Sequence, residues 1–370
     1  MLSYLKIIFV NKLCVMKKKI LITGSSGFWG YNQINYFLEK NNNFEITCVY
    51  NTNKNSLKEL NNIKKIQCNL EDDSEIIKLG DDYDIILHLA SVIEHTNDNS
   101  EKNININVNS SKNIFELARL IGKNKSIKVI CASTIGTVAC FNTNNESANE
   151  ESKFSMNSFN FPYYKSKILI EKMANKYRSN NIEIIFIRPP VIYGENDLKG
   201  RATSRIKKFL DKKIILYTKG NIPFCDINDL TKITNDIICK EKNEKIYNID
   251  GYQITIKKFY EILEELSGEK KIKIYIPYYF GLVFILIFRN LIKLPDIIEL
   301  KMGNCFWNSK SKYFEEFKWT DYKTTLKKSI DYIRKSDNKR EYNTSNTNYL
   351  YLFIFLSFLS FLFLPKIYPI

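Results

Sequence analysis

The stretch KKKILITGSSGFWG, residues 17–30, constrains the fold of this chain more than any other feature. Its first part, Lys19 to Thr23, is a short apolar run of the kind that forms a buried strand in a parallel sheet. Gly24, Gly27 and Gly30 follow in the pattern Gly-x-x-Gly-x-x-Gly, and the helix-like segment YNQINYFLEK comes next. At such a junction a pyrophosphate can approach backbone N–H groups at a helix start, where a Cβ atom would block it. We therefore predict a dinucleotide-binding unit near the start of the chain.

Strand-like and helix-like segments alternate through the first half of the chain. The helical pattern is clearest over residues 109–120 and 165–178. This alternation predicts an α/β fold with a Rossmann-type doubly wound parallel sheet, in which ligands bind at the carboxyl ends of the strands. We therefore expect the chemistry after Ala90, Ser133 and Pro189. The predicted strands span residues 19–23, 44–50, 63–69, 84–90, 126–133 and 182–189.

The composition excludes several classes of site. Only two histidines, His88 and His95, occur in 370 residues, so neither a histidine-based triad nor a zinc site is expected. The eight cysteines form no Cys-x-x-Cys pair, so we predict reduced thiols in a cytosolic compartment and no metal. The net charge is +15, but no cluster of Lys and Arg is interleaved with aromatic residues, so we predict no nucleic-acid partner. The expected partner is a small-molecule substrate.

The residues after the second predicted strand bear on the choice of cofactor. An acidic side chain there holds the ribose 2′-OH of NAD, whereas a basic one accommodates the 2′-phosphate of NADP. The sequence continues with Asn51 and reaches its first base at Lys54, without an acid between them. The predicted cofactor is therefore NAD or NADP, and Lys54 favours NADP.

The C-terminal end predicts attachment to a membrane. Residues 349–364, YLYLFIFLSFLSFLFL, carry no charge, and Lys323 to Arg340 contain seven Lys/Arg against Asp331 and Asp337. This asymmetry predicts a membrane-attached protein with its catalytic domain in the cytoplasm. The predicted organisation is an N-terminal extension (1–16), a NAD(P)-binding domain (17–185, to which 229–250 return), a smaller C-terminal substrate lobe (186–335), a polar linker (336–348) and a hydrophobic membrane anchor helix (349–366).

The order of these motifs resembles the extended short-chain dehydrogenase/reductases, also called the NAD-dependent epimerase/dehydratase family, over residues 17–335. TGSSGFWG is similar to the cofactor loop of that family, HLAS (88–91) to its motif beside the ribose, and ASTIGTV (132–138) to its Ser/Thr strand end. RPPVIYG (188–194), FCDINDL (224–230) and YNID (247–250) are similar to its C-terminal landmarks, while Asn69 stands where the family usually has Asp. The cofactor-binding residues that the resemblance implies are Gly24, Ser26, Gly27, Phe28, Trp29, Gly30, Asn51, Lys54, Asn69, Leu70, Leu89, Ala90, Ser91, Lys167 and Pro189.

The stretch SFNFPYYKSKILIEK (158–172) contains the Tyr-x-x-x-Lys pattern of that family. Tyr163 and Lys167 are four residues apart and therefore share one helical face. The resemblance implies that the Lys167 ammonium lowers the pKa of Tyr163, so that the phenol becomes a usable proton donor or acceptor. It further implies that Thr134 holds the substrate oxygen, that Lys167 also binds the nicotinamide ribose, and that Asn107 positions a water.

Alternatives remain at two of these positions. Ser133 takes the role of Thr134 if the register shifts by one residue, and Tyr164 is the second candidate for the tyrosine. His88 is expected to pack at a strand end near the cofactor. His95 lies in a loop that could face the substrate.

Three functions are compatible with the sequence. It is most similar to the dihydroflavonol-reductase-like and 3β-hydroxysteroid-dehydrogenase-like branches, which implies reduction of a ketone or oxidation of a secondary alcohol on a lipid-soluble, sterol-like or isoprenoid substrate. The alternative is a nucleotide-sugar epimerase or dehydratase with tightly bound NAD, in which Arg188, Arg201 and Arg205 serve a diphosphate. The third is a non-catalytic NAD(P)-binding scaffold. Homodimers through the helices that begin near Ser110 and Lys165 are common in the resembled family.

Overall fold

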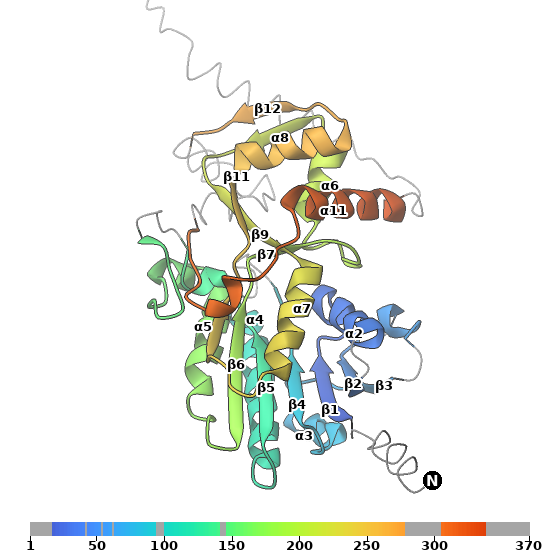
Figure 1. Ribbon diagram of the computed structural model, residues 1–370, viewed down its shortest axis with the longest axis vertical. Helices are drawn as coiled ribbons and strands as arrows, with labels where there is room; N and C mark the ends of the chain where they lie inside the picture. The colour runs from blue at the N-terminus through green and yellow to red at the C-terminus, as the bar shows by residue number, and fades with distance from the viewer. Residues whose placement is uncertain are drawn as a thin grey trace, which may run out of the picture.

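The computed structural model describes residues 17–40, 43–52, 55–60, 63–93, 100–140, 146–277 and 305–337. They form a sheet body and, above it in Figure 1, a smaller lobe. The predicted N-terminal extension, the predicted anchor helix, Lys54 and His95 lie outside the described residues. No helix within these stretches is long and apolar enough to cross a membrane.

A parallel sheet of seven strands forms the centre of the described body, as the alternating sequence pattern predicts. The strand order is β10-β6-β5-β4-β1-β2-β3. Since β1 pairs with β2 on one side and with β4 on the other, the direction of winding reverses there. The crevice in which sheets of this kind bind ligands is therefore expected beyond the carboxyl ends of these strands. The strands are β1 (Lys18–Thr23), β2 (Phe44–Tyr50), β3 (Lys64–Gln67), β4 (Ile85–His88), β5 (Ile127–Ala132), β6 (Ile182–Arg188) and β10 (Ile246–Asn248).

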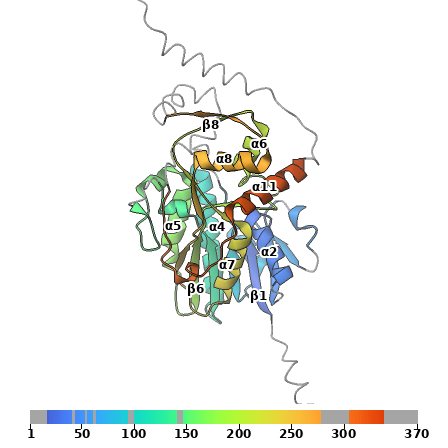
Figure 2. The same cartoon turned by 45° about the horizontal axis from the view of Figure 1, so that its top comes forward.

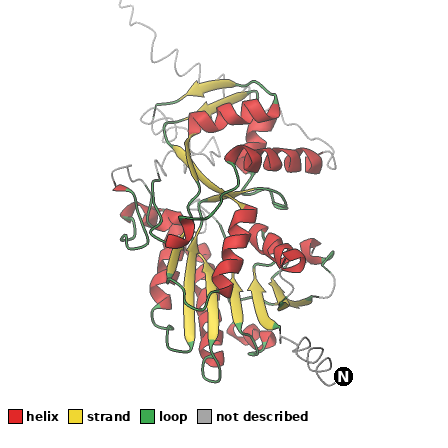
Figure 3. Ribbon diagram, viewed as in Figure 1, coloured by secondary structure: helices red, strands yellow, loops and turns green. Residues whose placement is uncertain are grey.

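Helices cover both faces of this sheet (Figure 3). In β1, Ile20 and Ile22 are fully buried in one apolar cluster, and Leu21 between them is fully buried in another. The first cluster contains apolar side chains of α2 and α7, and the second those of α4 and α5. Burial on both faces explains why the strand reads as an uninterrupted apolar run. The helices of the body are α2 (Phe28–Lys40), α3 (Asp73–Ile76), α4 (Ser100–Ile121), α5 (Pro162–Ala174) and α7 (Ile227–Cys239), with short 3₁₀ turns η1 (Asn55–Leu57), η2 (Ile77–Leu79), η3 (Ile135–Thr137) and η5 (Met156–Asn160).

The lobe has its own apolar core, which lies between two small sheets and three helices (Figure 2). Among the described residues one sheet has the order β11-β9-β7 and the other pairs β12 with β8. Thr255 caps the start of α8 with its side chain, and Gly268 ends that helix in the left-handed conformation, φ +74°. The elements are β7 (Val191–Tyr193), α6 (Ser204–Asp211), β8 (Ile214–Tyr217), β9 (Asn221–Asp226), β11 (Tyr252–Thr255), α8 (Ile256–Ser267), β12 (Ile272–Tyr275) and α11 (Tyr322–Asp337).

Segments from the C-terminal half return to the sheet body. The strand β10 extends the sheet beside β6, and α7 packs beside α2. The segment 305–320, which includes η6 (Lys312–Phe314), also lies on the body: Phe314 is buried in the cluster of α2 and α7, and Trp307 Nε1–H donates to the Ile249 carbonyl at 3.1 Å. The sequence analysis assigns this segment to the lobe, but its aromatic side chains pack against the body.

Candidate active site

The glycine loop at the end of β1 is shaped by close backbone approaches. Gly24 has φ +68°, and a Cβ atom there would lie 2.6 Å from the Ala90 amide nitrogen. A Cβ at Gly30 would lie 2.4 Å from the Gly24 carbonyl oxygen. A Cβ at Gly27 would meet that oxygen at 3.1 Å and no other atom within 4 Å. Gly24 and Gly30 are therefore required by packing. A Cβ at Gly27 would make one tight contact, with the Gly24 carbonyl, and would otherwise point into open space at the start of α2, where a phosphate would approach.

The remaining predicted cofactor residues that the structure describes follow the carboxyl ends of the strands. Ser26, Phe28 and Trp29 lie in the glycine loop and the first turn of α2, and Asn51 is exposed after β2. The buried hydroxyl of Ser91 has no hydrogen-bond partner among the described residues. An unpartnered buried hydroxyl beside the crevice suits a ligand with polar groups, such as a ribose. After β4 and β6 the predicted residues are Leu89, Ala90, Ser91 and Pro189.

The loop after β3 is held at the edge of the crevice by its neighbours. The Asn69 N–H donates to the Glu75 carboxylate at 2.7 Å, and the Leu70 carbonyl accepts from the Asn113 side chain of α4 at 3.0 Å. The Asn69 side-chain oxygen accepts from the Glu71 N–H at 3.3 Å. Asn69 therefore uses its side-chain oxygen for the local turn.

The predicted tyrosine and lysine lie on α5. This helix starts with Pro162 at its first position, where a missing N–H costs nothing. The Lys167 Nζ atom lies 5.6 Å from the centroid of the Tyr163 ring. Lys167 is 3% exposed, so its ammonium is almost completely removed from water. The helix thus brings the two side chains together, as their spacing predicts.

The pKa of Tyr163 shifts in the opposite direction from the predicted one. Burial raises the pKa of its phenol above the ordinary value. Burial also lowers the pKa of Lys167 to about 8, although Cys131 and Glu171 favour its charged form. The prediction of a lowered Tyr163 pKa is therefore wrong for this structure, because removal from water dominates over attraction by an ammonium that lies beside the ring.

The choice between Ser133 and Thr134 is resolved by their partners. The Ser133 hydroxyl is buried and donates to the Glu171 carboxylate at 2.5 Å. The Thr134 oxygen accepts from the Gly136 N–H at 3.3 Å as the N-cap of η3, and no described protein group accepts its hydroxyl hydrogen. Thr134 is thus the residue that can donate to a bound oxygen.

A buried ion pair that the sequence analysis missed joins three elements of the site. Arg188, at the end of β6, donates to Glu171 of α5 through Nε at 3.0 Å and through Nη2 at 2.5 Å. The two side chains are 2% and 3% exposed. Together with Ser133 at the end of β5, this clamp ties α5 to the strand ends beside Thr134. Arg188 is therefore not free to bind a diphosphate, contrary to the expectation for the nucleotide-sugar alternative.

The sequence contains both residues of this clamp but no local pattern that pairs them. Glu171 follows Lys167 by four residues on the same helix, and Arg188 directly precedes Pro189 at a strand end. Neither position alone indicates a contact, because the two residues are 17 apart and meet only when α5 packs beside β6.

Asn107 has protein partners on both sides of its amide. Its oxygen accepts from the Val92 N–H at 2.7 Å, and its nitrogen donates to the Val92 carbonyl at 3.0 Å and to the Ser166 hydroxyl at 3.0 Å. Ser166 in turn donates to the Tyr163 carbonyl at 2.7 Å. The Asn107 side chain therefore fixes the loop after β4 to the first turn of α5, whereas we expected it to hold a water.

His88 is structural, as expected, and its tautomer follows from its partners. Ser111 donates its hydrogen to the Asn107 carbonyl at 2.8 Å, so it accepts from His88 Nε2–H at 3.0 Å. Nδ1 then accepts from the Thr23 hydroxyl at 2.8 Å. Burial, with the Lys167 charge nearby, lowers the pKa of His88 to about 3. The imidazole is neutral and links β1, β4 and α4 beneath the crevice.

Tyr164 belongs to the packing of the body. It is 5% exposed, and its ring occupies the space where a Cβ of Gly136 would lie, 2.5 Å from Cζ. Burial raises the pKa of its phenol well above the ordinary value. The structure thus gives Tyr164 a packing role next to Tyr163.

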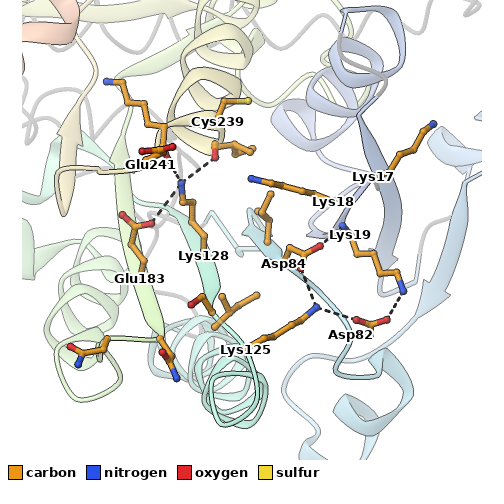
Figure 4. Close-up of a pocket in the computed structure, with 17 residues that line it drawn as sticks. Lys17, Lys18, Lys19, Asp82, Asp84, Lys125, Lys128, Glu183, Cys239 and Glu241 are labelled. Carbon is orange, nitrogen blue, oxygen red and sulfur yellow. Dashed lines mark hydrogen bonds and ion pairs between the residues drawn. The ribbon is translucent and has the colours of Figure 1, made fainter. Parts of the chain in front are cut away.

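A hollow lies at the edge of the sheet opposite to these residues (Figure 4). Some of its charged side chains are paired: Lys19 and Lys125 bind Asp82, and Lys125 also contacts Asp84 at 3.1 Å. Lys128 donates to the last carbonyls of α7, including that of Ile238 at 3.1 Å. This hollow is at the amino ends of the strands, so it is separate from the candidate active site.

Comparison with known proteins agrees with this geometry. The pattern of the NAD dependent epimerase/dehydratase family matches residues 20–250. The chain belongs to this family. It is therefore an enzyme of the extended short-chain dehydrogenase/reductase type, with an NAD-binding Rossmann fold.

The chain matches proteins of different lengths and different names. The probable polyketide synthase 34 of Dictyostelium discoideum is 26% identical over 329 residues, which cover 70% of this chain and 10% of that protein. The dTDP-D-glucose 4,6-dehydratase of the same organism is 28% identical over 261 residues, 65% of this chain and 59% of the other. The chain thus spans only about one tenth of the polyketide synthases that it matches.

Solved structures share the fold. The UDP-glucuronic acid 4-epimerase of Bacillus cereus, in complex with UDP-glucuronic acid and NAD, has a TM-score of 0.69 at 19% identity, over 86% of this chain and 99% of the other.

Proposed function

We propose that this family member oxidises a secondary alcohol of a nucleotide sugar and reduces the resulting ketone again within one turnover, as an epimerase or dehydratase does. The observation that carries the proposal is the pairing of Tyr163 with Lys167 on α5, with Thr134 after β5 and the glycine loop after β1 at the same carboxyl edge of the sheet. The dehydratase relative, which acts on a dTDP-sugar by its name, supports the substrate class. The structural neighbour with UDP-glucuronic acid supports the arrangement of the fold.

The residues present fit NAD. The open side of Gly27 and the unpartnered Ser91 hydroxyl lie at the carboxyl edge, where a dinucleotide binds in such sheets. The start of α2 would hold the pyrophosphate, and Lys167 would hold the ribose next to the reacting carbon. NAD, when bound, supplies the hydride acceptor for oxidation and the hydride donor for reduction. NADP stays a prediction that depends on Lys54.

Each protein group has a separate task in this chemistry. Tyr163 takes the hydroxyl proton as the alcohol becomes a ketone and returns a proton to the oxygen on reduction. Because burial raises the pKa of its phenol, Tyr163 needs a positive charge close by to release its proton. Lys167 supplies that charge, and Thr134 donates a hydrogen bond to the substrate oxygen. Asn107 acts at a distance by holding the first turn of α5.

The first test is to purify the protein without added nucleotide, denature it and identify what is released. Near-stoichiometric NAD is expected, because a hydride that returns to its substrate requires a retained cofactor. NMR of UDP- and dTDP-sugars incubated with the enzyme should then show interconversion. Tyr163→Phe should abolish it, whereas Tyr164→Phe, which removes the neighbouring hydroxyl, should preserve it. No interconversion by an enzyme that retains NAD would contradict the proposed substrate class.

A second candidate is favoured by the relatives named polyketide synthases, which include proteins 26–30% identical to this chain. It is net reduction of a ketone, or oxidation of an alcohol, on an apolar substrate. This reaction consumes the nucleotide, so the purified enzyme should be empty and should bind NADH or NADPH reversibly. Screening lipid-soluble ketones by loss of absorbance of the reduced cofactor tests it.

A further inference from the structure

The outer face of the sheet β8–β12 is aliphatic throughout. Ile272 pairs with Ile214, and Ile274 pairs with Leu216. Paired residues of a parallel sheet point to the same side, and alternate residues of a strand share a face, so these four side chains form one surface. Leu216 is 47% exposed and Ile272 is 62% exposed. We call Ile214, Leu216, Ile272 and Ile274 the aliphatic face.

The opposite side of this sheet is the one that packs on the lobe. Ile215 is buried in the core of the lobe, and Tyr217 packs against that core. Lys273 forms an ion pair with Glu264 of α8. The aliphatic face therefore points away from α8, at the end of the lobe farthest from the sheet body (Figure 1). A two-stranded sheet with one packed side normally carries polar residues on the other, so an aliphatic surface here indicates a partner.

The rim of the aliphatic face carries excess positive charge. Lys207 lies 3.9 Å from Asp211 and also binds Asp337, while Glu269 pairs with Lys271 at 2.7 Å and with Arg334 at 2.9 Å. These acidic groups at the strand ends thus already have basic partners among the described residues. The lysines that flank the two strands beyond these pairs are Lys212, Lys213, Lys219 and Lys270, of which the last three are exposed.

We propose that the aliphatic face docks on a bilayer that contains anionic phospholipids, with the lysines of its rim against the headgroups. Insertion of apolar side chains beside lysines is the combination that holds proteins at such interfaces, because apolar burial and attraction to anionic lipid add. The proposal does not depend on the substrate. It would place the lobe, which lies over the carboxyl ends of the sheet, next to the membrane (Figure 1).

The test places an environment-sensitive fluorophore on Leu216→Cys in the full chain, with the labelled wild-type chain as blank. The matched control is Ile77→Cys in η2, an apolar position that is 83% exposed and lies in the sheet body. With phosphatidylcholine vesicles that contain phosphatidylserine, the label at 216 should shift to the blue and be quenched by spin-labelled lipids. The label at 77 should do neither, and vesicles of phosphatidylcholine alone should have a much smaller effect at 216.

Charge reversal provides a second readout. Lys213→Glu, Lys219→Glu and Lys270→Glu combined should weaken partitioning onto the anionic vesicles at least tenfold, since each basic residue near such a surface contributes to binding. Lys123→Glu, an exposed lysine of the sheet body, should leave partitioning within twofold. The proposal is overturned if the chain does not sediment with anionic vesicles, or if it sediments while the label at 216 stays in water. It is also overturned if that label is already buried without vesicles, by the chain itself or by a second copy.

Discussion

Replacing Glu171 by Gln isolates the contribution of the buried clamp. The substitution keeps the size of the side chain but leaves the Arg188 guanidinium, 1% exposed, without a negative partner. Breaking one side of a buried ion pair costs about 3–5 kcal/mol, because the remaining charge is uncompensated. Unfolding free energies of domains are about 5–15 kcal/mol, so this loss is a large share of the total. Urea unfolding followed by tryptophan fluorescence measures it.

Glu116→Gln is a matched control for this experiment. Glu116 also binds an arginine and a hydroxyl: Arg119 Nη2 at 2.6 Å and the Tyr177 hydroxyl at 2.9 Å. Its side chain is 37% exposed and that of Arg119 is 62% exposed, so water screens the pair. We expect a loss below about 1 kcal/mol there.

The double variant Glu171→Leu/Arg188→Met tests the sign of the argument. Replacing a buried pair by apolar residues is often neutral, so most of the lost stability should return. A deficit of about 1–2 kcal/mol should remain, because the Ser133 hydroxyl loses its acceptor. Equal losses for Glu171→Gln and Glu116→Gln would refute the reasoning, since the first pair is buried and the second is exposed to water.

Three further predictions concern the site itself. Tyr163→Phe should lower kcat about 10²–10⁴-fold, because it removes the proton-transfer group, while the amount of nucleotide bound to the purified protein stays the same. Loss of bound nucleotide in this variant would indicate a structural effect instead. Gly27→Ala should weaken NAD binding while the melting temperature stays near that of the wild type, whereas Gly24→Ala, with its left-handed φ and its contact to Ala90, should lower the melting temperature. Burial lowers the pKa of Lys167 to about 8 from 10.5. Between pH 8 and 10.5 the unfolded chain therefore binds more protons than the folded chain, so the free energy of unfolding should rise with pH over this range. Lys167→Met should remove this rise and increase the free energy of unfolding at pH 7 by up to about 3 kcal/mol, while turnover is lost. If the free energy of unfolding of this variant still rises with pH as in the wild type, Lys167 is not the group responsible.

The limits of sequence reasoning are visible in α4. The helical pattern predicts residues 109–120, but the helix begins at Ser100. The stretch SEKNININV is rich in Asn and β-branched residues, which have weak helix propensity. Asn107 explains part of the difference, because its side chain bonds Val92 and Ser166 and holds that turn of the helix in place. Tertiary contacts outweigh local propensity here.

The sequence by itself determined the class of fold and the place of the site. The apolar run before Gly24, the glycine spacing and the Tyr163/Lys167 interval are local patterns, and each depends only on backbone geometry within one or two elements. They were sufficient to predict the parallel sheet and the carboxyl edge at which the site lies.

Only the tertiary structure decided which side chains at that edge can act. Ser133 and Thr134 are neighbours, yet one hydroxyl is taken by Glu171 and the other is not. The direction of the Tyr163 pKa shift follows from burial, which is set by packing from several elements. The clamp joins residues from separate elements for the same reason. Hydrogen bonds and desolvation depend on distances in space, and these are fixed only when α5, β5 and β6 are packed together.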